Sequence, residues 1–261
     1  MLHVAIDTGR PANLQRLPLS CRNLPRRNGV LVSETVAVLD RGERLHDTRR
    51  GLDYDKPRLR GWLHLVCFEA SLVVGTLLIV AAQGAGQTAI AAVYASTVSG
   101  MFGASALYHR GRWQPTTRAW LQRLDHLMIF LVIAGTATAP MALCIPSPYS
   151  WIGLALIWTL TLLAAGGRLV RMHAPEWLAG AIFIGLGWAA GAAVPAVWMH
   201  SGVKPAVLLI AGGLLYSVGA MAYHYRRPDP APAVFGYHEV FHLFVSVAAA
   251  CQYVAIACFL L

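Results

Sequence analysis

Long apolar stretches separated by short polar turns dominate the sequence after Arg60. Seven such stretches can be distinguished. The length of each is close to the ~20 residues that a helix needs to cross a 30 Å hydrocarbon layer. The stretches are Trp62–Ala82, Thr88–Tyr108, Leu124–Cys144, Trp151–Gly167, Trp177–Met199, Ala206–Tyr223 and Phe235–Leu261. The pattern predicts an all-α, polytopic membrane protein with a seven-transmembrane-helix bundle. The fourth stretch is the shortest, and we expect that it can extend by a turn at either end.

Residues 1–55 show neither helical nor strand periodicity. They mix arginine, aspartate, glycine and proline with short apolar patches, and the patch at Leu31–Leu39 is long enough for a short strand or helix. Such segments bury too little apolar surface to fold alone. We therefore predict a disordered cytosolic leader over residues 1–55 and a membrane domain over residues 56–261. The beginning does not resemble a signal peptide, because Asp7 and Arg10 interrupt it.

The distribution of charge predicts the orientation in the membrane. The chain has 261 residues, a formal net charge of +9 and only 13% charged residues, whereas soluble domains carry about a quarter. With the N-terminus cytosolic, 20 of the 21 Lys and Arg residues lie in the leader or in cytosolic loops, and Lys204 alone lies outside. Because cytosolic loops are enriched in Lys and Arg, we predict a cytosolic N-terminus and an external C-terminus.

Composition also excludes several classes of function. The basic residues flank apolar stretches, as membrane topology requires, so they do not indicate nucleic-acid binding. The five cysteines are odd in number and include no CxxC pair. Neither a disulfide framework nor a thiolate metal site is therefore expected.

Ionisable residues inside the stretches are the candidate functional groups. Each costs about 2.5–3.5 kcal/mol at the centre of a membrane helix on insertion scales. They are His64, Glu69, His109, Asp125, His126, His238, Glu239 and His242. With the predicted topology, the histidines and Asp125 all lie in the cytosolic leaflet.

Three of these histidines have the spacing of a metal site. His238 and His242 are four residues apart, so they project from one helix face and suit two nitrogen ligands of one metal ion, with His109 as a third. Three histidines and a water form an open zinc site, in which the metal lowers the pKa of the water towards neutrality. Asp125 can then act as general base or orient that water. Ser105, one turn before His109, can bond a ligand or polarise a substrate carbonyl.

Each residue taken singly has a plainer interpretation. Histidines at helix ends often lie among lipid headgroups, and Asp125 can form an interfacial ion pair with Arg123. Three histidines and one aspartate on three helices of one leaflet favour a metal site. Glu69 lies about two turns inside the first stretch, where it pairs with His64 or is protonated and hydrogen-bonded.

Residues 238–242 read His-Glu-Val-Phe-His, which matches the HExxH motif of soluble zinc proteases letter for letter. Such a protease requires a third ligand downstream, and no His, Asp or Glu follows His242. The third ligand must therefore come from an earlier helix, which favours a site inside the membrane. Glu239 as the general base remains an alternative.

At these residues the chain resembles the hemolysin III family of bacterial membrane proteins, which belongs to one superfamily with the progestin and adipoQ receptors and the alkaline ceramidases. The resemblance covers about residues 55–261. It rests on Pro57–His64, Ser105–His109, Arg123–His126, Ala134–Thr136 and His238–Phe244. Two positions depart from the family pattern: Ala137–Pro140 replaces a segment with a tyrosine, and Gln252 stands where a histidine is common.

The resemblance implies a zinc ion bound by His109, His238 and His242, a zinc-bound water held by Asp125, and support from Ser105. It also implies hydrolysis of a lipid amide, or an ester, in the bacterial cell membrane. Two other functions stay open: a non-catalytic regulator or receptor of membrane state with structural zinc, and a cytolysin, as the family name suggests. A cytolysin is expected to be soluble before insertion, which the constitutive spans argue against.

Overall fold

The structure, a computed structural model, describes residues 44–47, 52–170 and 176–261. The patch at Leu31–Leu39 lies outside the described residues. The chain divides into two compact units, Met1–Arg44 and Leu45–Leu261, and all the helices described below belong to the second. The strands β1 (Arg44–Asp47) and β2 (Leu52–Asp55) form a two-stranded sheet, in the last part of the segment predicted as a leader.

Helices make up nearly all of the remaining described residues. They are α2 (Trp62–Ala81), α3 (Gly84–Arg110), α4 (Pro115–Cys144), α5 (Tyr149–Val170), α6 (Glu176–Ala190), the 3₁₀ turn η3 (Gly191–Ala193), α7 (Val194–Ser201), α8 (Val203–Tyr225) and α9 (Tyr237–Phe259). Seven helical segments within the described ranges are long and apolar enough to cross a membrane. This confirms the predicted fold class, including the extension of the fourth span to 22 residues.

The fifth span differs from a single straight helix. It runs from Trp177 to Ser201, but η3 interrupts it between α6 and α7. Pro195 explains the interruption, because proline has no N–H for the helical ladder and its ring clashes with the preceding turn. A short 3₁₀ turn accommodates both effects.

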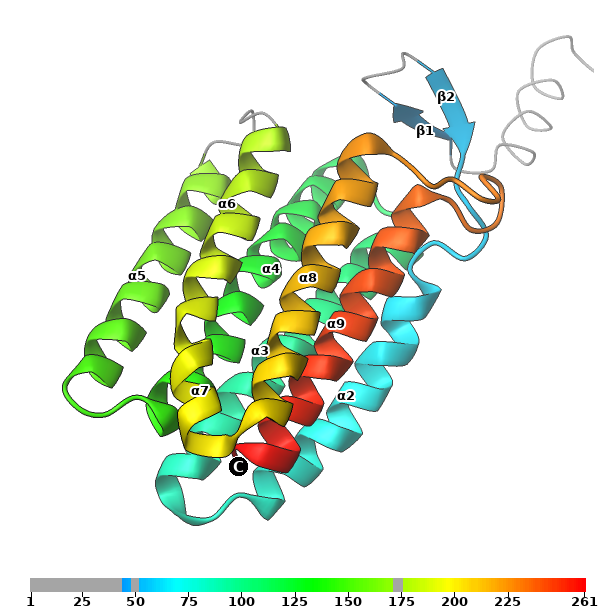
Figure 1. Ribbon diagram of the computed structural model, residues 1–261. Helices are drawn as coiled ribbons and strands as arrows, with labels where there is room; N and C mark the ends of the chain where they lie inside the picture. Colours follow the sequence, from blue (N-terminus) through cyan, green and yellow to red (C-terminus); the bar gives the residue numbers. More distant parts are fainter. Residues whose placement is uncertain (1–43, 48–51, 171–175) are drawn as a thin grey trace, which may run out of the picture. The chain divides into compact units, whose positions relative to one another are not determined.

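Neighbouring helices in the sequence pack along one another: α2 on α3, α3 on α4, α4 on α5, and α8 on α9 (Figure 1). The most enclosed helices are α3 and α4. Of the residues in their apolar 18-residue stretches, 50% and 56% are buried, against 11% in the span formed by α6 and α7. The main apolar core joins α2, α3, α4 and α9 around residues such as Tyr94, Phe102 and Ile256. The site residues described below come from the same four helices.

Large apolar side chains cover the outer faces of the bundle. Val80 is 78% exposed, Trp151 70% and Met199 89%. In water so many exposed apolar groups would cause aggregation, whereas hydrocarbon accepts them. The exposed surface therefore agrees with a bundle surrounded by lipid.

Candidate metal centre

Three histidines from two helices come together at one end of the bundle. His109 is the penultimate residue of α3, and His238 and His242 occupy the first two turns of α9. One ring nitrogen of each lies within 4.8 Å of the others, and this is the group of potential metal ligands found among the described residues. His109 and His242 are buried, and His238 is partly exposed. The predicted ligand set is therefore assembled by the fold.

The spacing of two ring nitrogens fits a zinc ion. The Nε2 atoms of His109 and His238 are 3.2 Å apart. Two nitrogen ligands 2.0–2.1 Å from a tetrahedral zinc ion lie roughly 3.3–3.4 Å from each other. A ring nitrogen of His242, Nδ1, is buried and has no hydrogen-bond partner in the described part of the chain. Buried nitrogens of this kind normally have a partner, so the donor set fits a zinc ion.

Polar contacts in the first turn of α9 fix where this helix begins. The loop that follows α8 supplies Asp229, whose Oδ1 accepts a hydrogen bond of 3.0 Å from the backbone N–H of Tyr237. Glu239 Oε2 accepts one of 2.8 Å from the N–H of Gly236. These bonds satisfy helix N–H groups that otherwise have no partner. They hold the turn that carries His238.

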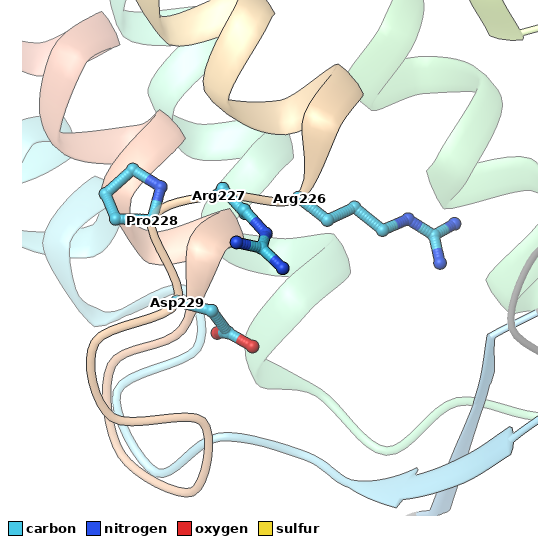
Figure 2. A pocket seen from close by; sticks show the side chains of 4 residues that line it. All are labelled: Arg226, Arg227, Pro228 and Asp229. Atoms are coloured by element: carbon cyan, nitrogen blue, oxygen red, sulfur yellow. The ribbon is translucent and has the colours of Figure 1, made fainter.

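The loop between α8 and α9 also lines a pocket of about 610 Å³, whose lining residues are Arg226, Arg227, Pro228 and Asp229 (Figure 2). None of the three histidines lines it. The pocket and the histidine cluster are therefore different features. Asp229 nevertheless connects them, because it lines the pocket and its hydrogen bond stabilises α9, the helix that carries His238 and His242.

A buried ion pair connects the segment before α2 to α9. The guanidinium of Arg60 donates from Nε to Glu239 Oε1, and both side chains are buried. Backbone bonds reinforce this connection, since Arg58 N–H donates to Ala233 O at 3.1 Å and Leu59 N–H to Val234 O at 3.0 Å. Both carboxylate oxygens of Glu239 are therefore engaged. This geometry argues against Glu239 as a general base.

Gly61 allows the start of α2 to approach His109. Its φ is +79°, a left-handed conformation that favours glycine. A Cβ at this position would lie 2.8 Å from the Cβ of His109, closer than real side chains pack. Trp62, the next residue, stacks under the guanidinium of Arg110 at 3.6 Å from the ring centroid. Gly61 and Trp62 thus allow the start of α2 to pack closely against the end of α3.

Ser105 and Asp125, the two predicted catalytic residues, lie close enough for their side chains to interact. Ser105 is buried one turn before His109, and Asp125 lies in α4. The Ser105 hydroxyl also lies 2.8 Å from Nδ1 of His64. Since the same serine contacts both side chains, it connects α2, α3 and α4 at the site.

The pairing of His64 with Glu69 is wrong. His64 Nδ1 contacts Ser105, and its Nε2 has no partner among the described residues. Glu69 is exposed on α2. The error comes from helical phase, because residues five apart lie on different faces of a helix.

Sequence reasoning missed the role of Arg60 and assigned His64 to Glu69 instead of Ser105. An arginine directly before a glycine and a membrane span was the available signal for the first. For His64 the signal was its depth in the same leaflet as the other histidines. Neither contact could be derived from spacing, because the partners lie 179 and 41 residues away.

Replacing Arg60 by leucine is expected to destabilise the protein by about 3–5 kcal/mol, because it leaves the buried carboxylate of Glu239 without a counter-ion. Adding Glu239→Gln should recover much of the loss, since glutamine is neutral and its Oε1 can still accept from the N–H of Gly236. Unfolding in detergent measures both effects. The control is Arg58→Leu, whose side chain is exposed; an equal loss there would contradict the assigned role of the ion pair.

Comparison with known proteins gives consistent matches. The family model described as haemolysin-III related matches residues 52–253. Hemolysin-3 of Bacillus cereus is 30% identical over 200 residues, which cover 74% of this chain and 87% of the relative. The Hemolysin-3 homolog of Bacillus subtilis (strain 168) is 26% identical over 140 residues, which cover 52% of this chain and 62% of the relative. The match to the family model spans all the candidate site residues.

Proposed function

The chain belongs to the haemolysin-III related family of multi-pass membrane proteins, and we propose that it is a zinc-dependent hydrolase of a lipid amide or ester in the bacterial cell membrane. The observation that carries the proposal is the convergence of His109, His238 and His242, with the neighbouring side chains of Ser105 and Asp125 close to each other. Three histidine ligands leave one position of a tetrahedral zinc site open, as catalytic sites do, and a carboxyl group close by suits proton transfer there.

The three histidines would hold the metal through their ring nitrogens. When bound, the zinc ion supplies Lewis-acid chemistry, polarising a carbonyl and lowering the pKa of water to about 7. Three protein ligands leave one position of a tetrahedral site open, as in catalytic zinc sites. The buried donors around the ligands exclude bulk water, which strengthens electrostatic interactions there.

Asp125 is the proton acceptor in this proposal. Its carboxyl group takes the proton from the attacking water and returns it to the departing amine or alcohol. The hydroxyl of Ser105, next to that carboxyl group, can donate its proton to it and so orient it. Ser105 also supports the site from α3, one turn from the ligand His109.

A lipid substrate suits the surroundings of the site. The helices that carry it expose apolar side chains such as Val66 and Leu243, and His238 is the partly exposed member of the cluster. A scissile bond near a lipid headgroup can therefore approach from the His238 side while its acyl chains stay in hydrocarbon.

The orientation with the cytosolic N-terminus places the site in the cytosolic leaflet. A single cysteine replacing exposed Lys204, in a chain otherwise free of cysteine, is expected to react with a membrane-impermeant maleimide added to intact cells. A cysteine replacing exposed Arg227 should react only after the cells are opened, because loops at alternate ends of seven spans face opposite sides. The reverse labelling pattern would invert the orientation.

Elemental analysis and a lipid hydrolysis screen of the detergent-purified protein test the proposal. We expect about one zinc per chain and release of fatty acid from at least one lipid amide or ester in the panel. Zinc without hydrolysis would support the second candidate, a regulator or receptor with structural zinc. The absence of metal would remove both candidates and return the histidines to interfacial packing.

Lysis of cells is the function that the names of the relatives suggest. The seven apolar spans suit permanent residence in a membrane rather than release in soluble form. We propose that any lysis is a consequence of altered membrane lipids, and the hydrolysis screen tests this by showing which lipids change.

A further inference from the structure

We propose that the pocket at the end of α8 binds the phosphate group of an anionic phospholipid. Its lining residues are Arg226, Arg227, Pro228 and Asp229 (Figure 2), and none of them belongs to the histidine cluster. The volume of the pocket, about 610 Å³, falls in the range of roughly 300–1,000 Å³ that is usual for small-molecule sites. The proposal needs neither zinc nor hydrolysis, so it is independent of the proposed function.

The pocket lies where a membrane-spanning helix ends. The span of α8 runs from Val203 to Tyr225, and Arg226 follows it directly. Tyr225 is 66% exposed, and tyrosines at the ends of spans lie at the level of the lipid headgroups. The arginines that follow are therefore at the depth of the lipid phosphates, which favours a lipid as the source of the phosphate group.

The lining groups have the chemistry of a phosphate site. A guanidinium presents its N–H donors in a planar fork that matches two phosphate oxygens, and the pocket contains two, from Arg226 and Arg227. Figure 2 shows both guanidinium groups and the carboxylate of Asp229 on the same side of the loop. Two formal positive charges and one negative charge leave a net charge of +1. This favours a headgroup with one net negative charge, such as phosphatidylglycerol, over zwitterionic phosphatidylcholine.

A tight turn at the end of α8 presents the two arginines. Arg226 has a φ of +55°, in the left-handed region that glycine usually occupies at helix ends. The N–H of Arg226 donates to Tyr223 O at 3.3 Å, and that of Arg227 donates to Ala222 O at 3.1 Å. Left-handed residues other than glycine are uncommon and are concentrated at functional sites. An arginine here ends the helix less favourably than glycine, but it adds a cationic side chain to the pocket.

Tyr237, the first residue of α9, contacts two residues of the pocket. The guanidinium carbon of Arg226 lies 5.9 Å from the centroid of the Tyr237 ring. The backbone N–H of Tyr237 donates to Asp229 Oδ1 at 3.0 Å. These contacts order the pocket before a ligand binds, which lowers the entropic cost of binding. Since a ligand that binds only the folded state stabilises it, a bound phospholipid should also raise the unfolding temperature.

Native mass spectrometry of the purified full-length protein in detergent tests the proposal. Dioleoyl phosphatidylglycerol and dioleoyl phosphatidylcholine are titrated separately, and we expect about one tightly bound lipid per chain with the first only. Arg227→Gln should weaken the binding of phosphatidylglycerol about 10-fold or more, the loss expected for a hydrogen bond to a charged group. Arg227→Lys keeps the charge without the planar fork, so its affinity should lie between those of the wild type and Arg227→Gln.

Arg112→Gln is the matched control. Arg112 is also exposed, but it lies between α3 and α4, outside the pocket. It removes the same charge, so a general attraction between basic loops and anionic lipid would be weakened equally by both substitutions; we expect wild-type binding instead. Asp229→Asn keeps an acceptor for the N–H of Tyr237 and removes the negative charge of the pocket. It should therefore bind phosphatidylglycerol more tightly than the wild type.

Several results would contradict the proposal. They are equal affinity for the two lipids, equal weakening in Arg227→Gln and Arg112→Gln, and weaker binding in Asp229→Asn. Displacement of phosphatidylglycerol by millimolar inorganic phosphate would assign the pocket to a soluble phosphate and contradict the lipid as its occupant. Unfolding in lipid-free detergent should be the same for wild type and Arg227→Gln, since Arg227 is exposed; weaker lipid binding is then not a loss of the fold.

Discussion

Asp125→Asn is expected to keep about one zinc per chain and to lower lipid hydrolysis about 10²–10⁴-fold, the contribution usual for a general base. Asparagine has nearly the size of aspartate, and its carbonyl oxygen can still accept from Ser105, so the packing of α3 and α4 is preserved. Its amide cannot take a proton from water. The variant therefore separates proton transfer from metal binding.

Initial rates with the lipid found in the screen, measured beside zinc analysis, check this prediction. Glu69→Gln is the matched control, because it neutralises another acidic residue of a membrane span whose side chain is exposed; it should hydrolyse at the wild-type rate. Full activity in Asp125→Asn would reject the assigned role of Asp125. Loss of zinc would show instead that Asp125 contributes to metal binding.

The double variant His238→Ala/His242→Ala is expected to lose zinc completely. It leaves one of three ligands, and a single imidazole does not hold zinc against water and buffer. Since metal binding stabilises only the folded state, the wild type should lose its extra thermal stability when a chelator is added. The double variant should not respond to the chelator.

Elemental analysis of wild type and double variant, prepared side by side, gives the decisive numbers. His200→Ala is the control, since His200 is exposed and lies in α7, outside the cluster. Zinc retained by the double variant would place the metal elsewhere. Zinc lost from the His200 control as well would indicate adventitious binding to histidine side chains.

The two experiments together separate the candidate functions. A hydrolase needs both the ligands and Asp125, whereas a regulator with structural zinc needs only the ligands. Asp125→Asn with unchanged zinc and unchanged biological effect would favour the regulator. The buried Arg60–Glu239 pair plays no part in this distinction, because it stabilises the start of α9 in either case.

Much of the fold follows from local sequence. Seven apolar stretches of membrane-spanning length predicted seven helices because, in hydrocarbon, every backbone N–H and C=O must bond within its own helix. The interruption at Pro195 was not predicted, since a proline can either kink a membrane helix or lie at the start of a new one. The grouping of the three histidines followed from spacing on one helix and from topology, which places His109 and His238 at the same end of the bundle.

Contacts between distant segments could not be predicted in this way. Whether Glu239 is a base or a structural anion depends on Arg60, which is 179 residues away. The partner of His64 is Ser105 of α3 rather than Glu69, because residues five apart lie on different faces of α2, and α3 packs against the face that carries His64. The sequence by itself thus determined the spans and predicted the leaflet and the three candidate metal ligands, since helical period and hydrophobic length are local properties. The tertiary structure decided the hydrogen-bond partners, because these depend on how the faces of separate helices pack.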